Sequence, residues 1–243
     1  MRTPRVYSKQ SIKIGQQLSL DKSACNYLAS ALRMTEGQQI HLFNGEGGEY
    51  KAEILKLNKN KGSVLVTQFI LADRESPLQI HLAIGISRGE RMDWLVQKAT
   101  ELGVQQVTPL FTGRTEVKLS EARVEKKRGH WQKIAISACE QCQRNTIPII
   151  HKPLNFDQWL RAPEKGHKVV LHHRTEKTIA QLQNSPSQLM LLVGPEGGLS
   201  DTEINAALAS GYIAAKIGPR VLRTETAPLA AISIAQSLWG DMG

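Results

Sequence analysis

The sequence has few cysteines and no long apolar run, and each shortage excludes a class of protein. Three cysteines in 243 residues cannot build the disulfide framework of a small secreted domain. No apolar run is long enough to span a membrane, and the opening residues, MRTPRVY, lack the apolar core of a secretory signal. The chain is nevertheless 41% hydrophobic, which is enough for a globular core. We therefore expect a cytoplasmic protein with reduced thiols and no membrane partner.

Several cofactor and metal motifs are also missing. The sequence contains neither a GxxxxGK[ST] phosphate loop nor a GxGxxG fingerprint after the first strand of its α/β part. Cys139 and Cys142 form a CxxC pair, but two further ligands for zinc are lacking, and redox pairs normally stand at the start of a helix. We interpret this pair as two small residues near the end of a helix, one of them buried, and we expect no metal.

The chain carries an excess of positive charge. It has 31 basic and 22 acidic residues, a formal net charge of +9. Residues 1–72 hold ten of the basic and five of the acidic residues, so under a third of the chain carries over half of the excess. A basic surface favours a polyanion such as nucleic acid. A basic protein without such a partner is an equally good explanation of the charge taken alone.

Residues 1–72 have the pattern of a small β domain. Short segments alternate apolar and polar residues, and the Asn44-Gly45 pair between two of them predicts a hairpin. The predicted strands are Val6–Tyr7, Gln17–Leu20, Gln39–Phe43, Glu49–Leu57 and Val64–Leu71, with a helix over Lys22–Arg33. This spacing predicts a small barrel or sandwich. The charged segment 73–77 ends in proline and predicts a boundary, so we divide the chain into domains 1–72 and 73–243.

Residues 73–243 alternate strands with helices, which predicts an α/β domain with a mostly parallel sheet. The predicted strands are Leu78–Ile86, Gln106–Phe111, His167–Leu171, Leu189–Val193 and Ala214–Ile217. The predicted helices are Arg91–Leu102, Glu121–Gln143, Thr178–Gln183, Ser200–Ser210 and Ala227–Trp239. Ligands of such sheets bind at the carboxyl ends of the strands, where loops lead into helices.

Two loops rich in glycine and proline stand at such strand ends. They are LLVGPEGGLS at 191–200 and IGPRVLRTETAP at 217–228. Glycine lets a ligand approach the backbone closely, and proline stiffens the loop around it. The N–H groups of Gly194–Gly198 could also hold an anion, although an ordinary turn between a strand and a helix would have the same sequence pattern. Because two such loops lie close together in the sequence, we predict a small-cofactor site built from main chain.

Polar side chains crowd the second loop and the turn after the first α/β strand. Arg220, Arg223, Thr224, Glu225 and Thr226 could bind an anionic or planar substrate and move a proton. Helix capping would explain the last three residues but not the two arginines, because cations are unfavourable near a helix N-terminus.

Two other polar features have a plainer alternative. The basic turn at 87–93 and the Lys98/Glu101 pair on the helix after it suit contact with phosphate, or a solvated helix face. His172 and His173 follow a strand, and they could line the cofactor pocket or lie in a surface loop.

The motifs LLVGPEGGLSDTE at 191–203 and IGPRVLRTETA at 217–227 resemble those of SPOUT methyltransferases. Within this superfamily the chain resembles the ribosomal RNA small subunit methyltransferase E family. The segments RVY at 5–7, SRGERM at 87–92, ELGV at 101–104, WQKIA at 131–135 and CEQCQR at 139–144 are similar to other signatures of that family. The resemblance therefore extends over the whole chain.

The resemblance implies a PUA-like RNA-binding β-barrel followed by an α/β domain with a deep trefoil knot, in a homodimer. It implies S-adenosyl-L-methionine as cofactor and N3-methyluridine, in the decoding region of 16S rRNA of the small ribosomal subunit, as product. The implied cofactor-binding residues are Leu171, His172, Val193, Gly194, Pro195, Glu196, Gly197, Ile217, Gly218, Leu222, Arg223 and Thr226.

Methylation at N3 of uridine requires loss of the N3 proton and stabilisation of the resulting anion. We expect Arg223 to stabilise that anion and Glu225 to be the base, with Glu101 as the alternative. Arg5, Arg88, Arg91 and Arg144 are expected to bind RNA phosphates. A SPOUT enzyme acting on another RNA position, such as a ribose 2′-hydroxyl, and a non-catalytic RNA-binding assembly factor remain alternatives. A nicotinamide oxidoreductase is disfavoured because the dinucleotide fingerprint is missing.

Overall fold

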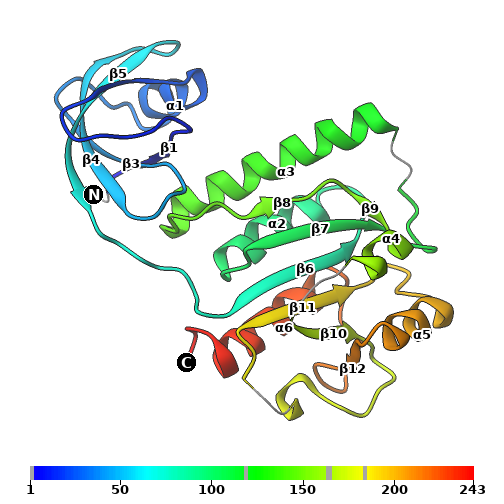
Figure 1. Cartoon of the computed structure of the whole chain (residues 1–243). Helices are drawn as coiled ribbons and strands as arrows, with labels where there is room; N and C mark the ends of the chain where they lie inside the picture. The colour runs from blue at the N-terminus through cyan, green and yellow to red at the C-terminus, as the bar shows by residue number, and fades with distance from the viewer. Residues whose placement is uncertain (1–2, 118–119, 163–165, 183–184) are drawn as a thin grey trace. The chain divides into compact units, whose positions relative to one another are not determined.

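The computed structural model describes residues 3–117, 120–162, 166–182 and 185–243 (Figure 1). Contacts divide the chain into two compact units. The first unit comprises Met1–Glu75 and Cys139–Ile147, and the second comprises Ser76–Ala138 and Pro148–Gly243. No pattern in the sequence indicates that the segment 139–147, from the middle of the chain, belongs with the N-terminal residues. Within the described ranges, no helix is both long enough and apolar enough to cross a membrane.

The first unit is built on a five-stranded sheet of order β1-β3-β4-β5-β2. Its elements are β1 (Arg5–Tyr7), β2 (Gln17–Leu20), α1 (Lys22–Asn26), the π-helical turn η1 (Tyr27–Ala31), β3 (Gln39–Phe43), β4 (Glu49–Leu57) and β5 (Gly62–Ile70). β1 pairs parallel with β3, and the other pairs are antiparallel. The predicted strands and the hairpin between β3 and β4 are confirmed. The predicted helix over Lys22–Arg33 is instead a short α-helix followed by a π turn.

The segment 139–147 is held in the first unit by Arg5. The Arg5 side chain donates hydrogen bonds to Glu49 Oε2 (2.9 Å), to the Cys139 carbonyl (2.7 Å), to the Arg144 carbonyl (3.2 Å) and to the Asn145 side chain. Arg5 is only 5% exposed. Because its donors are already used inside the unit, the structure gives Arg5 a structural role, and its contact with RNA phosphates stays a prediction.

Arg144 is likewise an internal residue. It is 3% exposed, and its Nη2 atom lies 2.6 Å from Glu75 Oε2. Its burial and this ion pair give Arg144 an internal role as well, and its contact with RNA phosphates stays a prediction. In the same segment Cys139 is buried and Cys142 half-buried, as the interpretation of the CxxC pair expected.

The second unit is a parallel α/β sheet of order β12-β10-β11-β6-β7-β8, with β9 also pairing β7. Every strand pairing described in it is parallel. Its strands are β6 (Gln79–Gly85), β7 (Gln106–Phe111), β8 (Ile149–Ile150), β9 (Leu154–Asn155), β10 (His167–Leu171), β11 (Gln188–Val193) and β12 (Ile213–Ala215). Its helices are α2 (Arg91–Glu101), α3 (Glu121–Cys142, which continues into the first unit), α4 (Phe156–Arg161), the 3₁₀ turn η2 (Ile179–Gln181), α5 (Asp201–Ala209) and α6 (Thr226–Trp239).

The predicted parallel α/β architecture is confirmed, with a few local differences. β8, β9 and α4 were not predicted, because elements of two to six residues carry no clear periodicity. The helix predicted over Thr178–Gln183 is only a 3₁₀ turn, and Gln183 lies outside the described residues.

Alternate residues of the central strands enter two different apolar layers. Ile80, Leu82 and Ile84 of β6 pack with apolar residues of α2, α3 and α6 on one face of the sheet. Ala83 of β6 lies in the opposite layer with Trp159 of α4 and residues of α5. Because successive side chains of a strand point to opposite faces, helices cover both faces (Figure 1). This double burial fixes the strands in place and exposes their carboxyl ends at one edge.

Candidate functional site

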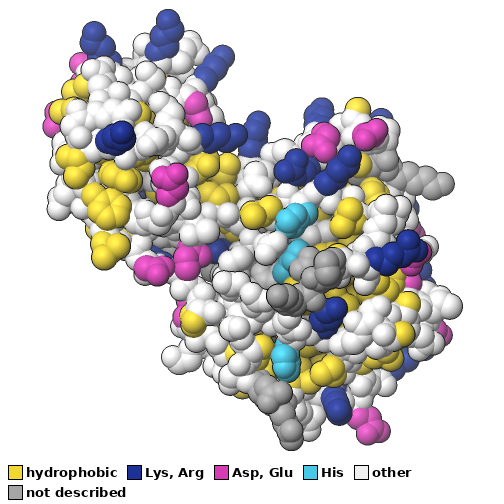
Figure 2. All heavy atoms as spheres, viewed as in Figure 1, with side chains coloured by type: hydrophobic (Ala, Val, Ile, Leu, Met, Phe, Trp, Pro, Cys, Tyr) yellow, Lys and Arg dark blue, Asp and Glu magenta, His cyan; other side chains and the backbone are white. Residues whose placement is uncertain are grey.

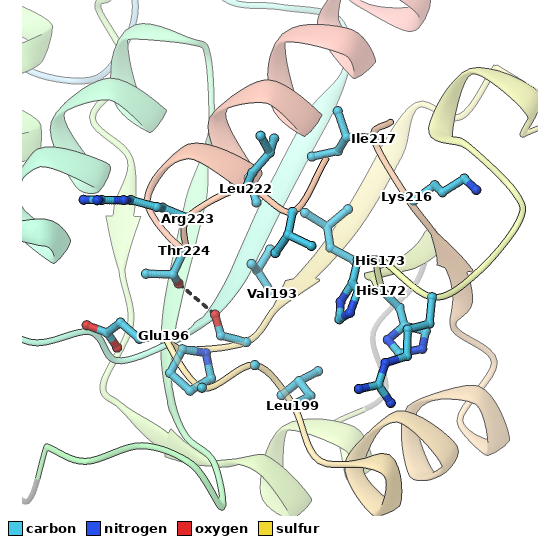
Figure 3. Close-up of a pocket in the computed structure, with 18 of the residues that line it drawn as sticks. His172, His173, Val193, Glu196, Leu199, Lys216, Ile217, Leu222, Arg223 and Thr224 are labelled. Atoms are coloured by element: carbon cyan, nitrogen blue, oxygen red, sulfur yellow. Dashed lines mark hydrogen bonds between the residues drawn. The ribbon is translucent and has the colours of Figure 1, made fainter. Parts of the chain in front are cut away.

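A cavity of about 550 Å³ lies at the carboxyl edge of the parallel sheet. It is lined mainly by the loops that follow β10, β11 and β12 (Figure 3). Arg91, at the start of α2, and Arg114, after β7, line it too. Of the predicted cofactor-binding residues, those lining it are Leu171, His172, Val193, Gly194, Pro195, Glu196, Gly197, Ile217, Gly218, Leu222 and Arg223. Thr226 is not among the lining residues. The structure therefore brings the two glycine loops to one pocket.

Close backbone contacts explain why glycine stands at two of these positions. A Cβ atom on Gly85, at the end of β6, would lie 2.4 Å from the ring of Pro195. A Cβ atom on Gly194 would lie 2.6 Å from the backbone nitrogen of Leu199. Such separations are shorter than van der Waals contact, so a larger residue at either position would displace the loop. The glycines therefore let the loop after β11 fold tightly over the end of β6.

A side-chain hydrogen bond joins the two glycine loops. The Thr224 hydroxyl donates to the Gly194 carbonyl at 2.9 Å (Figure 3). The start of the first loop is thereby fixed against the end of the second. The sequence placed Thr224 in the polar group around the second loop but gave no reason to pair it with the first.

Helix capping does not explain the polar residues before α6. Glu225 occupies the N-cap position, and its side chain makes no capping hydrogen bond. Its Oε2 atom instead lies 3.9 Å from Arg91 Nε, and its side chain is 18% exposed. Within the described chain, no hydrogen bond or ion pair is recorded for the exposed guanidinium of Arg223, which extends away from Leu222 (Figure 3). The pocket is therefore lined by a carboxylate, Glu225, and by an arginine without a partner among the described residues, Arg223, two positions apart in the sequence.

Glu196 is tied to the turn after β6. Its Oε1 atom accepts a hydrogen bond from the Arg88 backbone N–H (2.9 Å) and forms an ion pair with Arg91 Nη1 (2.8 Å). Partial burial raises the pKa of Glu196, but these hydrogen bonds and the charge of Arg91 outweigh burial and leave the pKa below its usual value. Glu196 therefore remains an anion that holds Arg91 against the glycine loop.

The two histidines after β10 also line the pocket, which favours the pocket over a plain surface loop. Burial, together with the neighbouring His173 and Arg174 charges, lowers the pKa of His172. His172 is therefore a neutral imidazole near neutral pH. Its ring centroid lies 5.7 Å from that of His173.

The structure does not bring Glu101 to the pocket. Glu101 forms an ion pair with Lys98 at 2.8 Å, and it lies about 15 Å along α2 from Arg91. Arg88 does not line the pocket either, and its guanidinium pairs with Glu116 at 2.6 Å. Sequence reasoning also missed a lining residue, Arg114, which follows the carboxyl end of β7 as the other site loops follow their strands.

Both units match known protein families. A family model for the RNA methyltransferase domain matches residues 74–236, and one for the RNA methyltransferase PUA domain matches residues 20–67. The ribosomal RNA small subunit methyltransferase E of Buchnera aphidicola from Schizaphis graminum is 39% identical over 99% of this chain and 98% of its own length. The protein of the same name from Bacillus subtilis is 34% identical over 93% of this chain and 92% of its own. The chain belongs to the ribosomal RNA small subunit methyltransferase E family.

Solved structures agree with this family assignment. A putative methyltransferase from Legionella pneumophila, solved with bound S-adenosylmethionine, has a TM-score of 0.96 and 42% identity, covering 99% of this chain and all of that one. A ribosomal RNA small subunit methyltransferase E from Neisseria gonorrhoeae, bound to S-adenosylmethionine, has a TM-score of 0.95 and 34% identity over the full length of both chains. Membership of this family confirms the predicted fold class, whereas the trefoil knot stays a prediction.

Proposed function

We propose that the chain is an S-adenosylmethionine-dependent methyltransferase that modifies N3 of a uridine in 16S rRNA. The observation that carries the proposal is the joining of both glycine loops into one pocket that also presents Arg223 and Glu225. The relatives bound to S-adenosylmethionine supply the cofactor class. We further propose that the protein acts in the cytoplasm, where an rRNA substrate would be found, and that it works as a homodimer.

The pocket fits this cofactor. Leu171, Val193, Ile217 and Leu222 give the cavity apolar walls suited to a flat ring system, and the glycine loops supply backbone donors and acceptors. Among the described residues other than its two chain neighbours, no heavy atom lies within 4 Å of the position that a Cβ atom on Gly218 would take, so a ligand has room beside that main chain. When bound, S-adenosylmethionine supplies a methyl group already activated on a sulfonium. The two glycine loops would hold the cofactor so that its methyl group faces N3 of the target uridine.

Two side chains of the second loop would carry out the proton and charge steps. Glu225 would take the proton from N3, which frees the nitrogen lone pair to accept the methyl group. As the N3–methyl bond forms, the methyl–sulfur bond of the cofactor would break, and its electron pair would stay on sulfur, so that a neutral thioether leaves. The negative charge passes to the two carbonyl oxygens that flank N3, and Arg223 donates hydrogen bonds to them. We prefer Glu225 to Glu101 as the base because only Glu225 lines the cavity. Arg91 and Arg88, beside the cavity, remain the proposed phosphate contacts.

The first unit offers a further basic surface for RNA. Lys51, Lys56, Lys59 and Lys61, all exposed, lie on β4 and on the turn between β4 and β5. Figure 2 shows Lys and Arg side chains projecting from the visible face of this unit. These exposed lysines, unlike the buried Arg5, can exchange counterions with a polyanion.

The function is tested on rRNA from a strain lacking the gene. We expect mass spectrometry of small-subunit rRNA nucleosides to find one N3-methyluridine lost, and the wild-type gene to restore it. Loss of a methyl group from another base or from a ribose would contradict the N3 assignment and would mean that the enzyme methylates a different RNA position. Unchanged rRNA, together with no heat stabilisation of the purified chain by S-adenosylmethionine, would favour a non-catalytic assembly factor.

The link between the loops predicts a binding defect. Thr224→Val removes the hydroxyl that donates to Gly194 while keeping the size of the side chain, and one hydrogen bond of this kind contributes about 1 kcal/mol. We expect about fivefold weaker binding of S-adenosylmethionine by titration calorimetry. Thr224→Ser keeps the donor and should bind as wild type. Equal affinities for the valine and serine variants would contradict this role.

A further inference from the structure

The segment after β7 contacts the first glycine loop through groups that no catalytic step uses. Arg114 Nη1 donates hydrogen bonds to the carbonyls of Gly197 (2.8 Å) and Leu199 (3.3 Å). The backbone N–H of Gly113 donates to Glu203 Oε1 at 2.7 Å. Glu203 stands in the first turn of α5, immediately after the loop. Two segments that are over 80 residues apart in sequence are thereby fastened together.

These contacts hold two peptide groups of the loop from both sides. In the peptide between Gly197 and Gly198, Arg114 binds the carbonyl, while the Gly198 N–H donates to the Pro195 carbonyl at 2.8 Å. In the peptide between Leu199 and Ser200, Arg114 binds the carbonyl, and Glu203 Oε2 accepts from the N–H at 2.8 Å. A planar peptide bound at both its oxygen and its nitrogen cannot turn about its flanking bonds.

The Arg114 side chain also lies directly on Gly197. A Cβ atom placed on Gly197 would be 3.2 Å from Arg114 Cβ and 3.4 Å from its Cδ. The aliphatic part of Arg114 therefore occupies the space that a side chain at 197 would take. A side chain at 197 would be unusually close to Arg114 and would push it aside by a few tenths of an ångström, and the φ angle of Gly197 is not positive.

We infer that Arg114 and Glu203 are positioning residues that set the main chain of the glycine loop before the cofactor binds. The inference rests on the proposed function, since it assigns these peptides to a cofactor held by main chain. A loop that is already ordered loses less conformational entropy on binding, so the ligand is held more tightly. Neither residue needs to touch the cofactor to have this effect.

The test uses the full-length chain without RNA. We expect Arg114→Ala to weaken the affinity for S-adenosylmethionine about tenfold by titration calorimetry. Amide hydrogen exchange over residues 194–200 should become faster in the cofactor-free protein. Because Arg114 is exposed, the melting temperature should stay within about 3 °C of wild type. Arg114→Lys keeps the charge but not the fork of donors and should bind with intermediate affinity.

Two further variants complete the test. Arg123→Ala removes an exposed arginine of α3 outside the cavity. It should leave unchanged both the affinity for S-adenosylmethionine and the amide hydrogen exchange over residues 194–200. Glu203→Gln keeps only one acceptor oxygen for two N–H donors, so exchange at Gly113 or Ser200 should rise. Wild-type affinity and exchange in Arg114→Ala would overturn the inference, as would a loss confined to RNA binding. A wild-type chain that binds no S-adenosylmethionine would refute the proposed function instead, and exchange in the cofactor-free protein would still decide the role of Arg114.

Discussion

Arg223→Ala is expected to slow methylation by about 10²–10³-fold at saturating RNA, the usual loss when one donor to a developing anion is removed. Arg223 lines the cavity, and among the described residues its guanidinium has no hydrogen-bond or ion-pair partner. Its backbone has a separate task, because the Arg223 carbonyl accepts from the N–H groups of Thr226 and Ala227 at the start of α6. The variant should therefore keep its fold and bind S-adenosylmethionine with an affinity within about twofold of wild type.

The pH dependence of the methylation rate distinguishes two roles for Arg223: stabilising the uridine anion, and simply adding positive charge to the pocket. A cation beside the uridine carbonyls favours the deprotonated base and lowers the pKa of N3. Without Arg223 the pKa of N3 returns upward, so the rate should keep rising with pH beyond the point where the wild-type rate levels off. A plateau at the wild-type pH with only a lower height would contradict this role.

Arg220→Ala is the matched control for Arg223→Ala. Arg220 is an exposed arginine of the same loop and also lines the cavity. The Arg220→Ala variant changes the local charge by the same amount as Arg223→Ala. We expect it to lower the methylation rate less than about tenfold and to leave unchanged the pH at which the rate levels off. Equal losses in the two variants would mean that only the net charge of the loop matters.

Much of the site could be predicted because its signals are local in the sequence. The loops 191–200 and 217–228 each follow an apolar strand and precede a capped or apolar helix, and parallel strands must end at the same edge. The capping box of Ser200 and Glu203 was readable for the same reason, since its partners are three residues apart.

The contacts that fix these loops could not be predicted because they are made through space. Thr224 donates to a carbonyl 30 residues away, and Arg114 to carbonyls more than 80 residues away. Sequence patterns report which face of an element is buried, but they do not report which backbone carbonyl a polar side chain meets. Exposure was misjudged for a related reason. Arg5 and Arg144 have the composition of a basic surface, yet each finds a carboxylate that permits its burial.

The second large effect concerns Arg5, which we expect to stabilise the first unit. Glu49 is 4% exposed, and its nearest arginine is Arg5 at 2.9 Å, with Arg74 at 3.9 Å; His41 Nδ1 lies 3.3 Å from the carboxylate. Arg5→Met should lower the unfolding free energy of the first unit by about 3–5 kcal/mol, because it leaves a buried carboxylate short of its partner. Calorimetric melting measures the loss. Lys59→Met, at an exposed turn, is the control and should melt as wild type.

A second substitution separates the contribution of the Arg5–Glu49 ion pair to stability from that of the hydrogen bonds that Arg5 donates to backbone carbonyls. Arg5→Met combined with Glu49→Met removes both charges, and replacing a buried ion pair by apolar side chains is often neutral. Here recovery should be incomplete, because the carbonyls of Cys139 and Arg144 still lose the donors that Arg5 gave them. Amide exchange over 139–147 should therefore stay fast in the double variant. Full recovery of stability would mean that Arg5 serves only to neutralise Glu49. A normal melting temperature in Arg5→Met, with weaker RNA binding, would return Arg5 to the RNA surface and contradict its structural role.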